Sequence, residues 1–168
     1  MSGLHQIQLR YDALEDRALL RVTTTERSEF RFSVTRRYAR LLWSALNGAA
    51  ARGGPAAAQP APAARKAVLA FEHEAAVSKA DFATRFQDQG LSTPLGTAPL
   101  LLARIKCAPI DDARVLLGMH PHEGQGIEVR LDRTLLHSLM KLLTEAARAG
   151  EWDLDMRMEM PQPGGGVN

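Results

Sequence analysis

The chain carries one apolar pattern twice, and this repetition constrains its fold more than any other feature. The acidic turn at Glu15 and Asp16 aligns with Asp111 and Asp112, and apolar positions align on both sides of it. The aligned pairs include Leu20 with Leu117, Phe30 with Ile127, Phe32 with Val129, Leu42 with Leu139 and Leu46 with Leu143. Because the match extends over about 45 residues with a single gap, it predicts duplication of one structural unit.

Each copy predicts three strands followed by a helix. Apolar and polar residues alternate in the segments expected to be strands, which are 7–11, 19–23 and 30–34 in the first copy and 100–108, 114–120 and 127–131 in the second. This period is typical of half-buried strands. Thr35 and Asp132 then stand where helix N-caps belong, and apolar residues follow them at helical spacing.

These patterns predict an α+β fold: an internal duplication of a β-β-β-α unit (antiparallel meander plus helix) that forms one pseudo-twofold domain over residues 1–150. The segments are repeat 1 at about 4–47, an Ala/Pro/Gly-rich linker at 48–64, a connecting helix and crossing segment at 65–99, and repeat 2 at about 100–148. The linker composition predicts flexibility, and the tail 156–168 is expected to be disordered. Residues 65–80 fit both a helix and a strand period, and their alanine content favours the helix.

The charge balance does not identify a partner. A net charge of +2 is too small to imply a polyanion, although residues 1–52 carry nine Arg against five Asp and Glu. The excess of Arg over Lys and the many Ala residues fit a GC-rich bacterial genome. One cysteine and the absence of a long apolar run favour a cytoplasmic protein with no membrane partner, as a monomer or homodimer.

The best binding candidate is a group of arginines in the first repeat. Arginine contacts phosphate well and stacks on bases, which would suit a single-stranded nucleic acid. The candidate nucleic-acid-binding residues are Arg10, Arg21, Arg31, Arg36, Arg37 and Arg40. Aromatic residues make up only 5% of the chain, so the sheet offers few stacking platforms.

Other clusters have stronger structural explanations. His120, His122 and Glu123 are weak metal-ligand candidates, because their spacing fits no zinc signature and a hairpin turn accounts for them. Glu72-His73-Glu74 fits a solvated helix face better than a general base, and Cys107 fits a buried strand position. No residue is predicted to be catalytic and no motif indicates a cofactor, so an enzyme is the less favoured hypothesis.

The duplicated strands-then-helix plan is similar to the general layout of the Whirly- and PUR-type single-strand-binding pseudo-dimers. Those families have four strands in each unit, whereas three are counted here, and no motif carries over. The leading interpretation is a non-enzymatic bacterial interaction or scaffold protein whose partner is another protein. The alternative is a single-stranded nucleic-acid-binding pseudo-dimer that uses the arginines of repeat 1.

Overall fold

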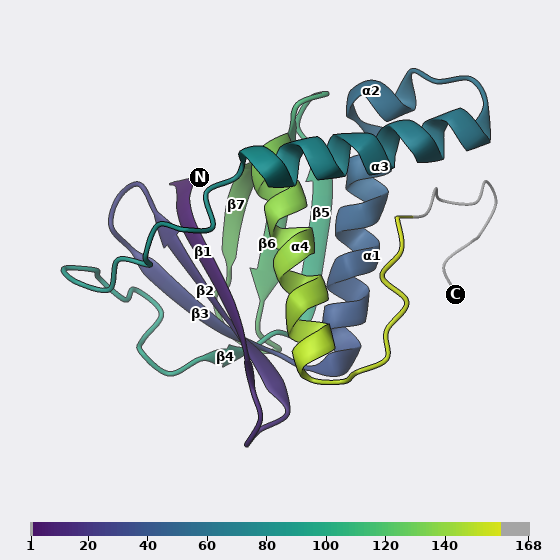
Figure 1. Ribbon diagram of the computed structural model, residues 1–168. Helices are drawn as coiled ribbons and strands as arrows, with labels where there is room; N and C mark the ends of the chain where they lie inside the picture. The colour runs from purple at the N-terminus through teal and green to yellow at the C-terminus, as the bar shows by residue number, and fades with distance from the viewer. Residues whose placement is uncertain (1, 159–168) are drawn as a thin grey trace.

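The computed structural model describes residues 2–158 and shows an α+β fold (Figure 1). Across these residues the chain forms one mixed sheet of seven strands and four helices. Most of the tail expected to be disordered, from 159 onward, lies outside the described residues. None of the described helices is both long and apolar enough to span a membrane.

Two antiparallel meanders supply six of the strands. The first consists of β1 (Ser2–Asp12), β2 (Arg17–Thr24) and β3 (Glu29–Val34), and the second of β5 (Arg104–Pro109), β6 (Arg114–His120) and β7 (Ile127–Asp132). Each meander leads into a long helix, α1 (Arg36–Arg52) or α4 (Arg133–Ala149). The expected N-caps are confirmed, since Thr35 accepts a hydrogen bond from the Tyr38 amide and Asp132 accepts one from the Leu135 amide.

The two meanders meet through two parallel strand pairings. With the two-residue strand β4 (Leu100–Leu101), the sheet order is β4-β3-β2-β1-β7-β6-β5, and β1 runs parallel to β7. The parallel pairing of Ser2 with Val129 in β1 and β7 has a counterpart in the parallel pairing of Phe32 with Leu100 in β3 and β4. The first strand of each copy thus meets the third strand of the other, as a twofold relation requires. These pairings are compatible with the predicted pseudo-twofold arrangement, which stays a prediction. Descent of both halves from one duplicated unit stays a prediction.

The segment expected to form one strand over 100–108 is divided between opposite edges of the sheet. β4 (Leu100–Leu101) pairs in parallel with β3, whereas β5 begins only at Arg104. Leu102, between them, is buried in the core. The Tyr38 hydroxyl donates a hydrogen bond to the carbonyl of Ala103. These contacts hold the chain where it leaves one edge for the other.

The Ala/Pro/Gly-rich segment 48–64 is largely helical, contrary to the expected flexible linker. α1 continues to Arg52, the short helix α2 (Gly54–Ala57) follows, and α3 (Pro62–Lys79) begins with its proline near the N-terminus. Ala50 and Ala56 are fully buried, so their small side chains let neighbouring elements approach closely. Composition alone missed this packing.

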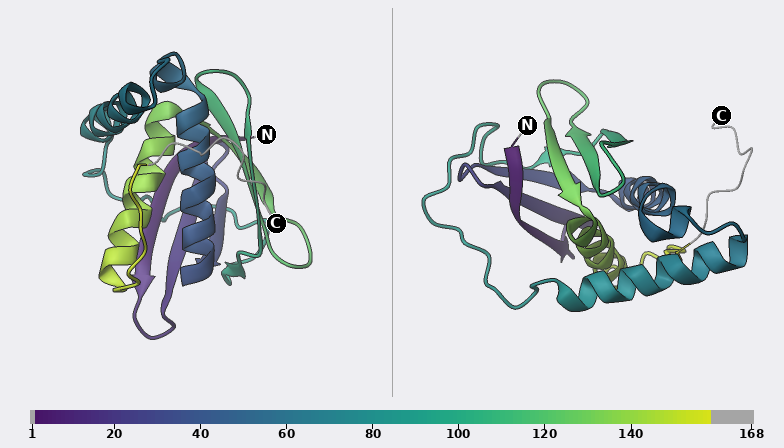
Figure 2. Two further views of the ribbon diagram at one scale, coloured as in Figure 1. Left: turned by 90° about the vertical axis from the view of Figure 1, so that its right-hand side faces the viewer. Right: turned by 90° about the horizontal axis from the view of Figure 1, so that it is seen from above.

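The helices lie on one face of the sheet and bury its apolar side chains. α1 and α4 run side by side in opposite directions, and α3 crosses them at one end (Figures 1 and 2). Among the apolar residues that the repeat aligns, Phe32, Leu42, Val129, Leu139 and Leu143 are buried. Phe30, near the start of β3, is only half-buried.

Candidate functional site

The first strand has a long edge that no other strand covers. β2 pairs with β1 as far as Asp12, but β7 pairs with it only at Ser2 and Gly3. Beyond this point α4 comes alongside β1 instead of a strand (Figure 2). Among the described residues, no strand pairs with this side of β1 over 6–12, which we call the free edge. In an antiparallel pair, every second residue turns its backbone groups away from its partner, here toward the free edge.

A segment without regular structure runs close to this edge. Residues 80–88, which we call the strap, leave the end of α3 and pass in front of β1 (Figure 1). The Gln6 side chain donates to the carbonyl of Arg85 at 3.3 Å and accepts from the Gln87 amide at 3.0 Å. The Gln6 side chain therefore donates one hydrogen bond to the strap backbone and accepts one from it, as the backbone of a neighbouring strand would.

Two aromatic rings of the strap provide further anchors. The guanidinium carbon of Arg21 lies 4.3 Å from the centre of the Phe86 ring, and the Lys141 ammonium of α4 lies 4.0 Å from that of Phe82. Such cation–π contacts stabilise by about 0.5–1 kcal/mol each at exposed sites. Arg21 also donates to Asp88 at 2.6 Å, so the strap is held to both the sheet and α4.

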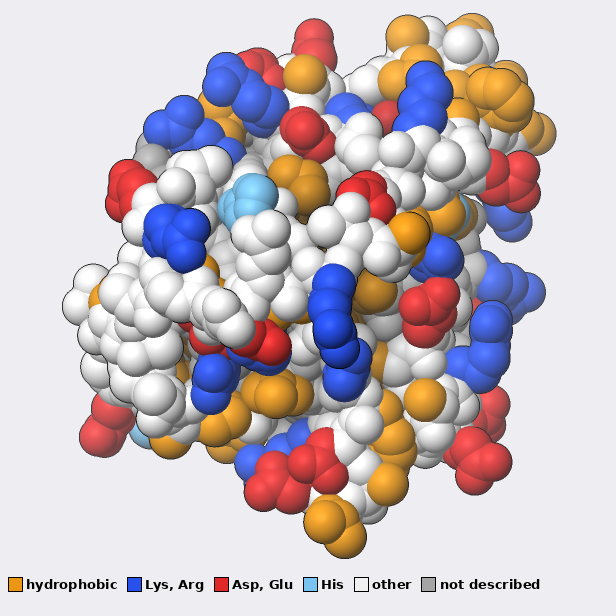
Figure 3. Space-filling model, turned by 60° about the vertical axis from the view of Figure 1, so that its left-hand side comes forward, with side chains coloured by type: hydrophobic (Ala, Val, Ile, Leu, Met, Phe, Trp, Pro, Cys, Tyr) orange, Lys and Arg blue, Asp and Glu red, His pale blue; other side chains and the backbone are white. Residues whose placement is uncertain are grey.

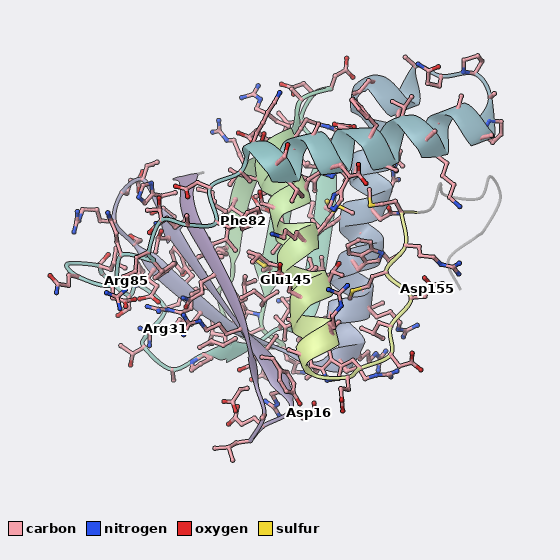
Figure 4. All side chains as sticks on the ribbon, viewed as in Figure 1. Asp16, Arg31, Phe82, Arg85, Glu145 and Asp155 are labelled. Carbon is pink, nitrogen blue, oxygen red and sulfur yellow. The ribbon has the colours of Figure 1, made fainter. Side chains whose placement is uncertain are left out.

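β1, the strap and α4 enclose a groove of about 1010 Å³. Apolar side chains come from the core side of β1 and from one stripe of α4, and polar or basic ones come from the outer side of β1 and from the strap. Ile7 and Leu9 of β1 and Leu135 and Leu142 of α4 are among the apolar lining residues, and Arg10 and Arg85 are among the basic ones. Figure 4 labels Phe82 close to α4 and Arg85 farther out along the strap. The groove therefore has an apolar wall and a basic rim.

A buried ion-pair network supports the sheet beside the groove. Glu29 is 3% exposed and contacts Arg21 at 2.5 Å and Arg31 at 2.9 Å. Burial alone would raise the pKa of Glu29, but the hydrogen bonds and charges of both arginines outweigh it and hold this pKa below its usual value. The guanidinium groups of Arg21 and Arg31 are thus engaged within the molecule.

The six candidate arginines do not form one surface. Arg10, Arg21 and Arg31 lie on the outer face of the sheet, whereas the other three belong to α1 on the opposite side. Arg36 donates to the carbonyl of Trp152 at 2.7 Å. Within the described residues, the structure shows no side-chain hydrogen bond or ion pair for Arg10, Arg37 or Arg40. Arg10 lies on the sheet, whereas Arg37 and Arg40 lie on α1. On the face in Figure 3, basic side chains are interspersed with acidic ones.

A second cluster of ionisable groups lies between α3 and α4. Glu72 pairs with Arg133 at 2.5 Å, and Nδ1 of His73 lies 2.8 Å from Nδ1 of His137. His137 is fully buried, and its Nε2 atom has no hydrogen-bond partner among the described residues, since Glu72 Oε1 lies 3.6 Å away. Burial lowers the pKa of His137 to about 4; the Glu72 charge opposes this shift, and the charges of His73 and Arg133 reinforce it.

The weak metal-ligand candidates do not come together. His120 ends β6, and His122 and Glu123 are exposed in the loop before β7. Within residues 2–158, no three His, Cys, Asp or Glu side chains are grouped so that they could hold a metal ion. Cys107 is half-buried on β5, and burial raises the pKa of its thiol, which disfavours the nucleophilic thiolate.

Sequence reasoning missed both the strap and the histidine pair. The sequence predicted only a crossing segment where the strap lies, and the free edge depends on which strands become neighbours. His137 stands among leucines at helical spacing, a pattern that signals burial but not a partner. Glu72 and His73, expected on a solvated face, are half-buried against α4.

Comparison with known proteins gives no family for this fold and groove. The chain matches no protein-family model, and neither a curated protein nor a solved structure matches it significantly.

Proposed function

We propose that this chain is a non-enzymatic interaction protein that binds a segment of another protein in the groove between β1, the strap and α4. The observation that carries the proposal is the groove itself, with its apolar wall, basic rim and uncovered strand edge. Small-molecule sites bury most of the ligand surface among predominantly apolar side chains. This groove is long and mixed in character, and six consecutive residues of β1 line it, which suits an extended polypeptide better.

The arginines favour this function over nucleic-acid binding. A phosphate backbone needs several free cations along one surface. Arg21 and Arg31 are instead committed to Glu29, and Arg36 is bonded to the carbonyl of Trp152. Nucleic-acid binding is therefore retained as an outcome of the test, with Arg10, Arg37 and Arg40, which form no ion pair within residues 2–158, as its remaining candidates.

The test is selection of binding peptides followed by a groove-blocking variant. Peptides would be selected on the wild-type protein from a phage-displayed library of linear random sequences, synthesised with a fluorophore and measured by anisotropy. Leu142→Arg places a long charged side chain in the groove, whereas Leu41→Arg places the same side chain on the exposed face of α1. We expect binding to the Leu142 variant to be at least about tenfold weaker, a loss of about 1.4 kcal/mol, and binding to the Leu41 variant to be unchanged.

Two results would contradict the proposal. One is failure to select any peptide that binds the folded protein. The other is submicromolar, salt-sensitive binding of a labelled single-stranded oligonucleotide that is lost when Arg37 and Arg40 are changed to Glu. Circular dichroism of each variant checks that the fold survives.

A further inference from the structure

The free edge of β1 defines how a partner would bind, and this inference rests on the proposed function. An unpaired strand edge presents N–H and C=O groups that are ready to pair with another extended chain, and proteins usually cover or blunt such edges. Here α4 and the strap stand beside the edge, but no described strand occupies it. The lining residues of β1 run consecutively from His5 to Arg10, about 20 Å of strand.

The side chains around the edge define two rows with different chemistry. Ile7 and Leu9 belong to the row of β1 that faces the helices, on the same side as Leu135 and Leu142 of α4. Arg10 belongs to the opposite row, on the side of the strap that carries Arg85. Because successive side chains of a strand point to opposite faces, an added strand would present every second side chain to each row.

The charged side chains of the groove favour a partner of the opposite charge. Its two carboxylates are already engaged, since Asp81 accepts hydrogen bonds from the amides of Ala83 and Thr84, and Asp88 pairs with Arg21. No ion pair within residues 2–158 involves Arg10 or Arg85, although both line the groove. The groove thus offers cations without acidic partners beside an apolar wall.

We propose that β1 receives an extended acidic segment of another protein as an added β-strand. Its acidic side chains lie beside Arg10 and Arg85, and its apolar side chains contact Leu135 and Leu142. Main-chain hydrogen bonds to the free edge supply affinity in this mode of recognition, and the alternate side chains supply specificity.

The decisive experiment is an N-methylation scan of an acidic peptide obtained by the selection described above. Methylating one backbone nitrogen removes one donor and leaves the side chains unchanged. In a strand paired on one side, only alternate amides point to the neighbour. We expect every second N-methyl group to weaken binding about tenfold or more and the intervening ones to leave it nearly unchanged.

Charge variants provide a second, independent measurement. Arg10→Glu and Arg85→Glu should each weaken binding of the acidic peptide, and Arg104→Glu, on the distant edge strand β5, should not. A peptide that is blocked by Leu142→Arg but shows no alternation in the scan would overturn strand addition and leave the proposed function standing. Absence of any groove-dependent peptide would overturn both.

A second copy of this chain is the competing occupant. Light scattering of the wild-type protein with and without peptide separates the two. A monomer in both samples supports a partner peptide. A dimer that the peptide dissociates would assign the edge to a second copy and overturn the proposed partner.

Discussion

Single residues in this protein show how far burial changes the chemistry of an ordinary side chain. His137 is buried beside His73 of α3, with Glu72 of the same helix and Arg133 of α4 as the charged neighbours. Since the two Nδ1 atoms are within hydrogen-bond distance, one ring must donate and the other accept, which requires at least one neutral imidazole. The cluster therefore joins α3 to α4 only while at least one of the two histidines is uncharged.

This arrangement predicts a loss of stability in mild acid. In the folded chain the pKa of His137 is about 4, below its usual value near 6.5. Between pH 4 and pH 6.5, the unfolded chain therefore binds a proton at His137 that the folded chain does not bind. The stabilising contribution is complete above about pH 6.5 and is lost as the pH falls toward 4. Its size is on the order of 3 kcal/mol.

Urea unfolding across this pH range measures the effect. His137→Leu removes the titrating group, and its free energy of unfolding should vary less between pH 7 and pH 5 than that of the wild-type protein. His122→Gln, in an exposed loop, should keep the wild-type pH dependence. Equal pH dependence in all three proteins would show that His137 is not the titrating group.

Phe32 tests the core at the same scale. Its side chain is fully buried on β3, and Phe32→Ala should lower the free energy of unfolding by about 3–5 kcal/mol through lost burial and a residual cavity. Leu14→Ala, at a 98% exposed turn position, should change it by less than about 0.5 kcal/mol. Denaturant melts compare the two, and a loss below about 1 kcal/mol for the Phe32 variant would contradict its core position.

At the scale of elements, the local sequence pattern correctly predicted strands and helix starts that depend on neighbouring residues alone. Alternation over 30–34 and 127–131 predicted strands, and Thr35 and Asp132 predicted helix starts, because strand period and N-capping depend on a few neighbouring residues. Segment 48–64 was predicted to be flexible, but it is largely helical. The tertiary contacts that bury Ala50 and Ala56 stabilise its helices, and composition does not reveal such contacts.

The strap is the element most open to proteolysis. It is largely exposed and lacks helix or strand, whereas the alanine-rich segment 48–64 is mostly helical. Limited trypsin digestion should therefore cut first after Arg85, and a groove-binding peptide should slow this cut. Mass spectrometry identifies the site. First cleavage after Arg52 or Arg65 would indicate that the helical segment opens more readily than the strap.

At the scale of the whole molecule, the repeated pattern predicted the elements but not their partners. The parallel pairing of β1 with β7 depends on contacts between residues more than a hundred positions apart, as with Ser2 and Val129. Nothing in either local segment encodes that choice of partner. The groove follows from the same junction, because the free edge exists only where β1 leaves β7.

In our proposal, the junction between β1, the strap and α4 is the binding surface for another protein. Amide NMR of the isotope-labelled protein, titrated with a selected peptide, tests it most directly. We expect the largest shift changes in β1 from His5 to Arg10, in the strap and along α4 from Thr134 to Leu142. Changes concentrated instead on the α1 face that carries Arg37 and Arg40, with the groove amides unmoved, would contradict the account.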